Sequence, residues 1–326
     1  MTTARTAADQ PAPDEPQRTR PRPGALQVLG AYVGLTKPRI IELLLVTTVP
    51  TMVVAERGLP DLWLVAATLI GGSLAAGSAN TINSYLERDI DALMGRTKRR
   101  PLPNHLVPAR NALVFGVVLG VASFAWLAGF VNVLSAWLGA AAILFYVFVY
   151  TLGLKRRSSQ NIVIGGAAGC VPVLVGWAAV TGEVGLPAWV LFAIVFYWTP
   201  PHFWALAIKY REDYARAGVP MLPVVRTAAE TARQILLYSI MLVTVTLIFG
   251  PIGGMGALYL SSALVLGAVF LAHAVRLVRA TPGEGSAEVG RAGGSTEKVA
   301  MGLFRYSITY LGLLFTAMAV DAVIRG

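Results

Sequence analysis

The feature that most constrains this chain is a series of nine long apolar segments. Eight of them run for roughly 18–24 residues and the first, which contains Pro50, is shorter. About 20 such residues cross the hydrocarbon core of a bilayer as a helix. Hydrophobic residues make up 56% of the 326 residues and charged residues only 13%, against about 25% charge in a soluble domain. The sequence therefore predicts an all-α integral membrane protein rather than a soluble enzyme or a disordered chain. The predicted spans are 40–55, 62–85, 112–130, 134–152, 162–181, 188–208, 235–252, 257–275 and 301–323.

The cationic residues fall in alternate loops. Of the 27 Lys and Arg residues, 25 lie in the N-terminal tail or in the loops after the second, fourth, sixth and eighth segments, which leaves only Arg57 and Arg325. Cytoplasmic loops carry an excess of Lys and Arg. We therefore expect a multi-pass protein of a bacterial-type cell (inner) membrane, with its N-terminus in the cytoplasm and its C-terminus outside. The net charge of +10 therefore does not indicate binding to nucleic acid, because the cations are distributed over the cytoplasmic loops and are not gathered on one domain.

The chain divides into a tail and a membrane domain. Residues 1–30 are rich in Pro, Arg, Asp and Thr and lack an apolar core, which predicts a disordered cytoplasmic tail. Residues 31–326 form the polytopic domain, with a mobile cytoplasmic loop at about 280–298. The second and sixth spans both lead into a charged extension that ends in a Pro-containing turn. This symmetry predicts two four-helix halves plus a ninth helix around a central cavity, with a site between the halves.

Three oxygen-bearing side chains follow the second span at a spacing of four. Asn83, Glu87 and Asp91 lie on one helical face, because four residues turn a helix only about 40° beyond a full rotation. Such a face suits Mg²⁺, which takes one or two carboxylates together with substrate phosphate oxygens. The alternative is a solvated helix end with charges at helical spacing. Asp89 falls on the opposite side and is expected to pair with solvent or an Arg.

A weaker pattern follows the sixth span. Lys209 and Asp213 are again four residues apart, and a lysine there can contact phosphate as a point charge. The alternative is an ordinary cytoplasmic loop, and the two interpretations are about equal on this stretch alone.

Cations at several loop mouths on the same side form a candidate diphosphate clamp, which would stabilise diphosphate as a leaving group. Arg39 and Arg100 rank highest because each lies next to a rigid proline. Most cations in cytoplasmic loops set topology only, which is the alternative for each. The candidates are Lys37, Arg39, Arg96, Arg100, Lys155, Arg156 and Lys209.

His202 follows a proline pair that can kink the sixth span. A neutral imidazole can bind heme iron, and a satisfied polar residue at a kink is the somewhat favoured alternative. The glycine pairs Gly71-Gly72 and Gly165-Gly166 lie inside spans, where close helix packing explains them better than ligand binding.

Taken together, these residues resemble the UbiA superfamily of intramembrane prenyltransferases, in its heme-farnesylating branch. The resemblance runs from about Gly34 to Val323, and jointly its motifs are highly specific. They are Thr36-Lys37-Pro38-Arg39, Asn83-x3-Glu87-x-Asp89-x-Asp91, Met94-x-Arg96-Thr97-x2-Arg100-Pro101-Leu102, Tyr150-Thr151-x2-Leu154-Lys155-Arg156, Asn161-Ile162-Val163-Ile164-Gly165-Gly166, Pro201-His202-Phe203-Trp204 and Asp213-Tyr214-x2-Ala217-Gly218-x-Pro220-Met221-Leu222-Pro223.

The resemblance implies a defined reaction. The farnesyl group of farnesyl diphosphate would move to the vinyl group of heme b with addition of water, giving heme O and diphosphate on the way to heme A for terminal oxidases. Heme b is a substrate here, and His202 would orient it. A downstream heme A synthase is a candidate partner besides the lipid bilayer. Aromatic faces at Tyr146, Tyr150 and Trp204 would stabilise an allylic cation. The catalytic set and Mg²⁺ ligands would be Asn83, Glu87, Asp91 and Asp213.

Two departures from the superfamily pattern bear on the acceptor. Glu87 stands where Asp is usual, and Lys209 stands where the wider superfamily has Asp. The lysine resembles the heme-farnesylating branch and argues against the rival of the same chemistry, transfer to a quinone precursor or another aromatic acceptor. Rivals of another class are a membrane transporter and a heme-binding scaffold without catalysis.

Overall fold

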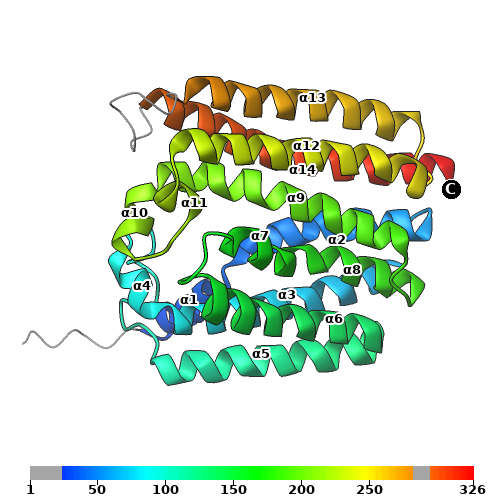
Figure 1. Cartoon of the computed structure of the whole chain (residues 1–326). Helices are drawn as coiled ribbons and strands as arrows, with labels where there is room; N and C mark the ends of the chain where they lie inside the picture. Colours follow the sequence, from blue (N-terminus) through cyan, green and yellow to red (C-terminus); the bar gives the residue numbers. More distant parts are fainter. Residues whose placement is uncertain (1–23, 282–293) are drawn as a thin grey trace, which may run out of the picture.

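The protein is a bundle of long, roughly aligned helices in the computed structural model, which describes residues 24–281 and 294–326 apart from the side chains of 39–45. Within these residues every regular element is a helix (Figure 1). Eight helical stretches are long and apolar enough to cross a membrane. They are α3 (Leu62–Leu86), α5 (Ala109–Phe130), α6 with the π-helix η1 (Val133–Leu154), α7 with α8 (Asn161–Thr181), α9 (Leu186–Lys209), α12 (Ala228–Ile252), α13 (Ala257–Ala280) and α14 (Gly294–Arg325).

The first of the nine predicted spans corresponds to α2, Pro38–Glu56. It follows α1 (Ala25–Thr36) after the single residue Lys37. Part of α2 lies among the side chains that are not described, so the described residues support eight spans and leave the ninth as a prediction.

Two segments that were predicted to be irregular are in part helical. Residues 1–23 of the predicted tail lie outside the described residues, but 25–30 form the first turns of α1 rather than disordered chain. Residues 282–293 of the predicted loop also lie outside, whereas α14 already begins at Gly294. The Thr296 hydroxyl donates to the Ala280 carbonyl at 2.7 Å, which ties the start of α14 to the end of α13.

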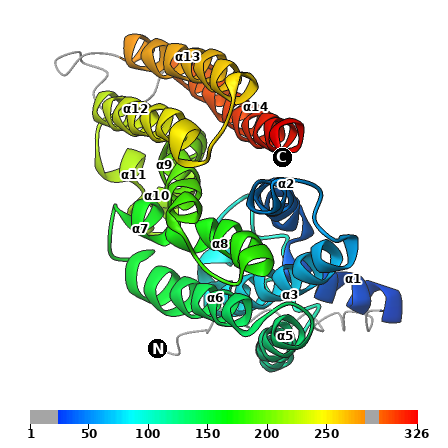
Figure 2. The same ribbon diagram turned by 90° about the vertical axis from the view of Figure 1, so that its right-hand side faces the viewer.

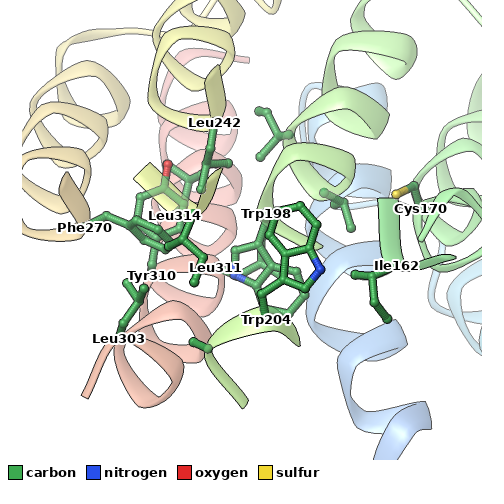
Figure 3. Packing of buried hydrophobic residues seen from close by; sticks show 14 of the residues in the cluster. Ile162, Cys170, Trp198, Trp204, Leu242, Phe270, Leu303, Tyr310, Leu311 and Leu314 are labelled. Carbon is green, nitrogen blue, oxygen red and sulfur yellow. The ribbon is translucent and has the colours of Figure 1, made fainter. Parts of the chain in front are cut away.

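The helices form two packed groups. In the first, α2, α3, α5, α6 and α8 (Ala167–Thr181) follow one another in a closed ring of contacts. In the second, α9, α12, α13 and α14 pack together (Figure 2). Large aromatic side chains fill the second group, and Figure 3 shows the Trp198 and Trp204 rings among its buried residues. Contacts of α8 with α9 and of α2 with α14 join the groups.

An apolar cavity of about 160 Å³ lies inside the first group. Its walls come from α2, α3, α5, α6, η1 and α8, while Val195 of α9 is the one lining residue from the second group of helices. This cavity lies in the N-terminal group of helices, whereas large aromatic side chains fill the second group. Apolar cavities of this size stay dry and accept apolar guests.

Short helices gather at one end of the bundle. They are α4 (Arg88–Leu93), α10 (Arg211–Arg216) and α11 (Leu222–Val225), and the C-terminus lies at the opposite end (Figure 1). The predicted acidic and basic residues belong to this end.

Candidate active site

The junction of α3 and α4 carries the first acidic motif. Glu87 ends α3 with non-helical dihedrals, φ −102° and ψ 9°. The backbone bonds nevertheless continue through it, from Glu87 N–H to the Asn83 carbonyl at 2.9 Å and from Asp91 N–H to the Glu87 carbonyl at 2.8 Å. All three residues are at least 97% buried. Burial of two carboxylates at a helix end rules out the simple solvated end.

Each of these side chains is held by a cation from another part of the chain. Lys37 Nζ donates to Asn83 Oδ1 at 2.9 Å, and Lys155 Nζ donates to Glu87 Oε2 at 2.6 Å. The third cation, a guanidinium, binds Asp91. Arg100 Nη1 lies 2.8 Å from both of its oxygens. The three cations were predicted to bind diphosphate, and the three side chains they contact were predicted to bind the metal. Buried charged groups such as the two carboxylates require partners of this kind.

Lys37 owes its position to a sharp turn. Its backbone is left-handed, with φ 53°, between α1 and α2. The Asn80 amide fixes the preceding residue by donating to the Thr36 carbonyl at 3.1 Å. A non-glycine residue held in this conformation stores strain, which clusters at functional sites.

The environment of the Lys37 ammonium favours its neutral form. Burial lowers the pKa of Lys37 to about 7; the nearby Arg100 cation adds to this shift and the Glu87 carboxylate opposes it. A bound anion favours the charged form of a lysine. Lys37 is therefore suited to take up charge when a phosphate group arrives.

Arg100 is positioned by the loop after α4. The Thr97 hydroxyl donates to the Asp91 carbonyl at 2.9 Å, and Arg100 N–H donates to the Thr97 carbonyl at 2.9 Å. These two bonds fold the loop back over the acidic motif. The guanidinium is consequently placed by local structure rather than by the ion pair alone.

The π-helix η1, Phe145–Leu154, supplies the opposite wall. The sequence predicts an ordinary helix here, and the wider π turn is common at functional sites. Thr151 accepts a bond from the Asn83 amide at 3.1 Å and donates to the Tyr146 carbonyl at 2.8 Å. The Tyr150 ring packs on bare backbone, since an ideal Cβ at Gly165 would lie 2.1 Å from it.

The polar cluster and the apolar cavity are neighbours. Asn80 and Tyr146 both line the cavity. Asn80 lies one helical turn before Asn83, and the Tyr146 carbonyl accepts the Thr151 hydroxyl that binds Asn83. The Tyr146 and Tyr150 ring centroids are 5.2 Å apart. A molecule with an anionic head and an apolar tail matches this arrangement.

The oxygen donors of the cluster fit Mg²⁺. Two carboxylates and an amide oxygen are the hard ligands that Mg²⁺ prefers, and it needs only one or two carboxylates when phosphate completes the shell. Glu87 Oε1 is buried without an aligned hydrogen bond, although the Lys155 ammonium is close to it. Among the described residues no three His, Cys, Asp or Glu side chains gather as a metal site. Phosphate oxygens would therefore have to complete the coordination.

The second acidic motif forms a separate patch. Asp213 in α10 pairs with Arg216, and an ideal Cβ at Gly95, in the loop after α4, would lie 3.6 Å from either Asp213 oxygen. The Arg96 guanidinium and the Lys209 ammonium lie 5.7 and 5.8 Å from the Tyr210 ring centroid. The structure thus places Arg96, Lys209 and Asp213 around the same loop, without a described contact to Glu87 or Asp91.

This fold and motif set match a known family. The model of the UbiA prenyltransferase family matches residues 44–289. The chain belongs to the UbiA prenyltransferase family.

Relatives of this UbiA chain are similar over nearly their whole length. A protoheme IX farnesyltransferase of Parafrankia sp. (strain EAN1pec) is 57% identical over 295 residues, 90% of either chain. Protoheme IX farnesyltransferase 1 of Saccharopolyspora erythraea is 56% identical over 326 residues, covering 99% of this chain and 98% of the relative.

Solved structures share the UbiA fold at much lower identity. A digeranylgeranylglyceryl phosphate synthase superposes with a TM-score of 0.73 at 15% identity, covering 91% of this chain and 99% of the other. A UbiA homolog from Archaeoglobus fulgidus, bound to GPP and Mg²⁺, gives a TM-score of 0.58 at 17% identity, with 90% and 99% covered.

Other predicted residues lie outside the buried cluster of this UbiA chain. Arg156 forms an exposed ion pair with Asp89 at 2.7 and 2.9 Å, as expected for Asp89. Trp204 packs against Tyr238 in the second helix group and is not part of the cavity lining. The side chain of Arg39 lies outside the described residues.

His202 belongs to α9, and its ring packs against α14. Its Nδ1 atom is 2.7 Å from the Ser307 hydroxyl, and its ring stacks on Trp198 with centroids 4.2 Å apart. These contacts agree with a histidine whose hydrogen bond is made within the protein, beside a proline pair. In the described part of the chain, the second ring nitrogen, Nε2, has no hydrogen-bond partner.

Three supporting residues were not predicted. Thr97 and Thr151 position Asp91 and Asn83, and Asn80 fixes the turn at Lys37. Thr97 and Thr151 stand inside quoted motifs, and Asn80 is an amide inside an apolar segment. Polar residues within spans tend to be functional, which is the signal that identifies Asn80 and Thr151.

Proposed function

We propose that this chain transfers the farnesyl group of farnesyl diphosphate to a vinyl group of heme b. The bond from farnesyl carbon to diphosphate oxygen breaks, and the vinyl group forms a carbon–carbon bond to the farnesyl carbon. Water then adds to the resulting cation and a proton is released, which gives heme O and diphosphate. The family, and the names of relatives at 56–57% identity, support this proposal.

One observation carries the proposal: buried carboxylates paired with half-buried cations adjoin an apolar cavity. The cations Lys37, Arg100 and Lys155 would bind the diphosphate and stabilise the negative charge that develops as it leaves. Arg39, Arg96 and Lys209 would extend this binding along the rim. Arg156 would act more weakly, because Asp89 already holds it at the exposed surface.

Asn83, Glu87 and Asp91 would hold Mg²⁺, with Asp213 approaching from the second helix group. When bound, the metal would neutralise charge on the diphosphate oxygens. The A. fulgidus homolog of the same fold, bound to GPP and Mg²⁺, supports Mg²⁺ as the metal. The chain itself supplies the buried oxygen atoms and the cations that keep them in place.

The farnesyl chain would occupy the cavity between α3, α6 and α8. Small side chains such as Gly72, Ala76 and Gly139 leave room for it. Tyr146 at the polar end of the cavity would place an aromatic face near the reacting carbon, where it stabilises positive charge. The apolar walls would keep water away until the new bond has formed.

Heme b would approach from the second helix group, where His202 would orient it. A quinone precursor or another aromatic acceptor is the alternative with the same first step, and Lys209 argues against it. A transporter would explain the helices but not the paired carboxylates and cations at one end.

The membrane arrangement is part of the proposal. We infer that α2 is the ninth span and that the end with α4 and α10 faces the cytoplasm, which leaves the C-terminus outside. The distribution of 25 of 27 cations supports this orientation. A heme A synthase would take up the product.

The test uses the purified full chain in lipid with heme b, farnesyl diphosphate and Mg²⁺, and mass spectrometry of the heme. Heme O is expected. Absence of heme O from folded protein that binds heme would reject the proposal, and prenylation of a quinone precursor instead would establish the alternative.

A further inference from the structure

Ser307 of α14 makes the only hydrogen bond to His202 among the described residues. The two atoms, Ser307 Oγ and His202 Nδ1, are 2.7 Å apart. The same hydroxyl lies 2.7 Å from the Phe304 carbonyl oxygen one turn earlier in α14. The Trp198 indole N–H donates to the Ser307 carbonyl at 2.7 Å, which locks α9 and α14 together at this level.

Counting protons decides which way these bonds run. A serine hydroxyl has one hydrogen to donate, and a carbonyl oxygen can only accept. The contact between Ser307 Oγ and the Phe304 oxygen therefore uses the serine proton. The His202 nitrogen facing the hydroxyl must then be the donor, so Nδ1 carries the ring proton. In neutral imidazole the other nitrogen, Nε2, is left with the lone pair.

The ring is also fixed in its plane. Trp198 stacks on one side with an interplanar angle of 20°, and the Phe304 ring lies 4.7 Å away at 30°. Phe203 approaches edge-on at 5.1 Å. With three aromatic neighbours and one hydrogen bond, His202 cannot turn its ring over without losing the Ser307 contact.

We infer that Ser307 is a positioning residue that holds His202 as the Nδ1–H tautomer, with the Nε2 lone pair presented to an electron-pair acceptor. This inference rests on the proposed function in one respect: the acceptor is the iron of the heme substrate. Histidine ligands of metals commonly donate their other ring N–H to a neighbouring oxygen, which fixes the tautomer and the ring orientation. The hydroxyl of Ser307 provides that oxygen.

A histidine with only a structural role beside the proline pair would behave differently. Its hydrogen bond would stabilise the α9–α14 packing, and loss of the bond would lower the melting temperature without a spectroscopic consequence for heme. A positioning role predicts in addition a change in the tautomer and in heme ligation, which a loss of stability alone does not produce.

The tautomer can be read directly. The chain has three histidines, so nitrogen-15 NMR of histidine-labelled full-length protein, compared with His202→Ala, identifies the His202 signals. A protonated Nδ1 and an unprotonated Nε2 are expected, and the Ser307→Ala variant should lose this preference. A protonated Nε2 in the unmodified protein would overturn the inference whatever the enzyme's substrate.

Heme titration tests the consequence. Loss of a residue that orients a metal ligand typically weakens binding about 10- to 100-fold, so Ser307→Ala should weaken heme b binding by this amount and shift the Soret band. Metal-free protoporphyrin IX should bind equally to both proteins. Ser307→Thr, which keeps the hydroxyl, should restore heme binding.

Ser239→Ala is the matched control, because it removes another buried helical hydroxyl that donates to a carbonyl one turn earlier, that of Ile235. It should leave heme binding unchanged. Equal heme affinity and equal spectra for Ser307→Ala and the unmodified protein would overturn the inference. The farnesyl-transfer assay is scored separately, so a failure of heme ligation is distinguishable from a failure of the proposed reaction.

Discussion

Lys155 Nζ lies 2.6 Å from Glu87 Oε2, although 68 positions separate the two residues in the chain. The glutamate is at the end of α3 and the lysine follows the π-helix η1. Their ion pair therefore ties two spans together at the end of the bundle that carries the candidate site. The Glu87 side chain is 3% exposed and that of Lys155 19%.

Replacing one partner of this pair should be costly. Glu87→Gln leaves the Lys155 ammonium without a counter-charge, and breaking a buried ion pair in this way costs about 3–5 kcal/mol. We expect a clear fall in the melting temperature of the detergent-solubilised protein. The double variant Glu87→Gln/Lys155→Met should recover much of the loss, because no charge is then left unpaired. A single variant as stable as the unmodified protein would contradict the prediction.

Asp91 and Asp89 are two residues apart but should differ sharply in their effect on turnover. Asp91 is buried against Arg100, and Asp91→Asn should reduce kcat by about 100-fold or more, the scale of losing one charge-stabilising group. Asp89→Asn, at the exposed pair with Arg156, should leave turnover close to normal. Initial rates of heme O formation at saturating substrate make the comparison, and equal rates for the two variants would remove Asp91 from the site.

The exposed pair also predicts a pH dependence. The hydrogen bond from Arg156 holds the pKa of the Asp89 carboxyl below its ordinary value of 3.8. A carboxyl with a lowered pKa contributes stability above its ordinary pKa and loses that contribution as the pH falls through the lowered value. Asp89→Asn should therefore destabilise the protein by less than about 1 kcal/mol at neutral pH and by nothing in strong acid. Thermal unfolding at both pH values, repeated at high salt, measures it, and an effect that grows as the pH falls would contradict the assignment.

Helical periodicity singled out Asn83, Glu87 and Asp91 because their spacing is local, and all three residues are buried. The i→i−4 bonds run through Glu87 even where α3 ends. The partners of these residues come from far along the chain, so charge patterns indicated a set of cations but not their pairing. Arg156 was predicted to bind diphosphate on the same grounds as Lys155, yet it bonds to Asp89 at the surface.

The position of the cavity could not be predicted from sequence patterns. The apparent symmetry of two halves predicted a central cavity, but the two groups of helices differ in how they are filled. Ala and Gly line the first group, whereas Trp198, Phe249, Phe270 and Tyr310 fill the second. That difference emerges only when side-chain volumes are summed in three dimensions. The π-helix was likewise not predicted, since its apolar sequence is compatible with an ordinary helix.

Gly165 should tolerate no side chain. An ideal Cβ would lie 2.1 Å from the Tyr150 ring, and overpacking of this kind costs about 1–3 kcal/mol. We expect Gly165→Ala to lower the melting temperature and to raise the KM for farnesyl diphosphate, because Tyr150 must move. Gly129→Ala is the matched control, with nothing within 4 Å of its Cβ, and should be neutral or slightly stabilising. Equal behaviour of the two variants would show that Tyr150 is not held by this contact.

Filling the cavity should separate binding of the prenyl tail from binding of the diphosphate. Ala76 lines the cavity, and Ala76→Leu would place three more carbons where we propose the farnesyl chain lies. A clash in a binding pocket costs about 1–3 kcal/mol, so affinity for farnesyl diphosphate should fall about tenfold or more while affinity for inorganic diphosphate stays unchanged. The melting temperature should hold or rise, because the cavity loses empty volume. Ala122→Leu adds the same carbons to an exposed position on α5 and should change neither affinity. If Ala76→Leu binds farnesyl diphosphate as tightly as the unmodified chain, the prenyl tail lies elsewhere.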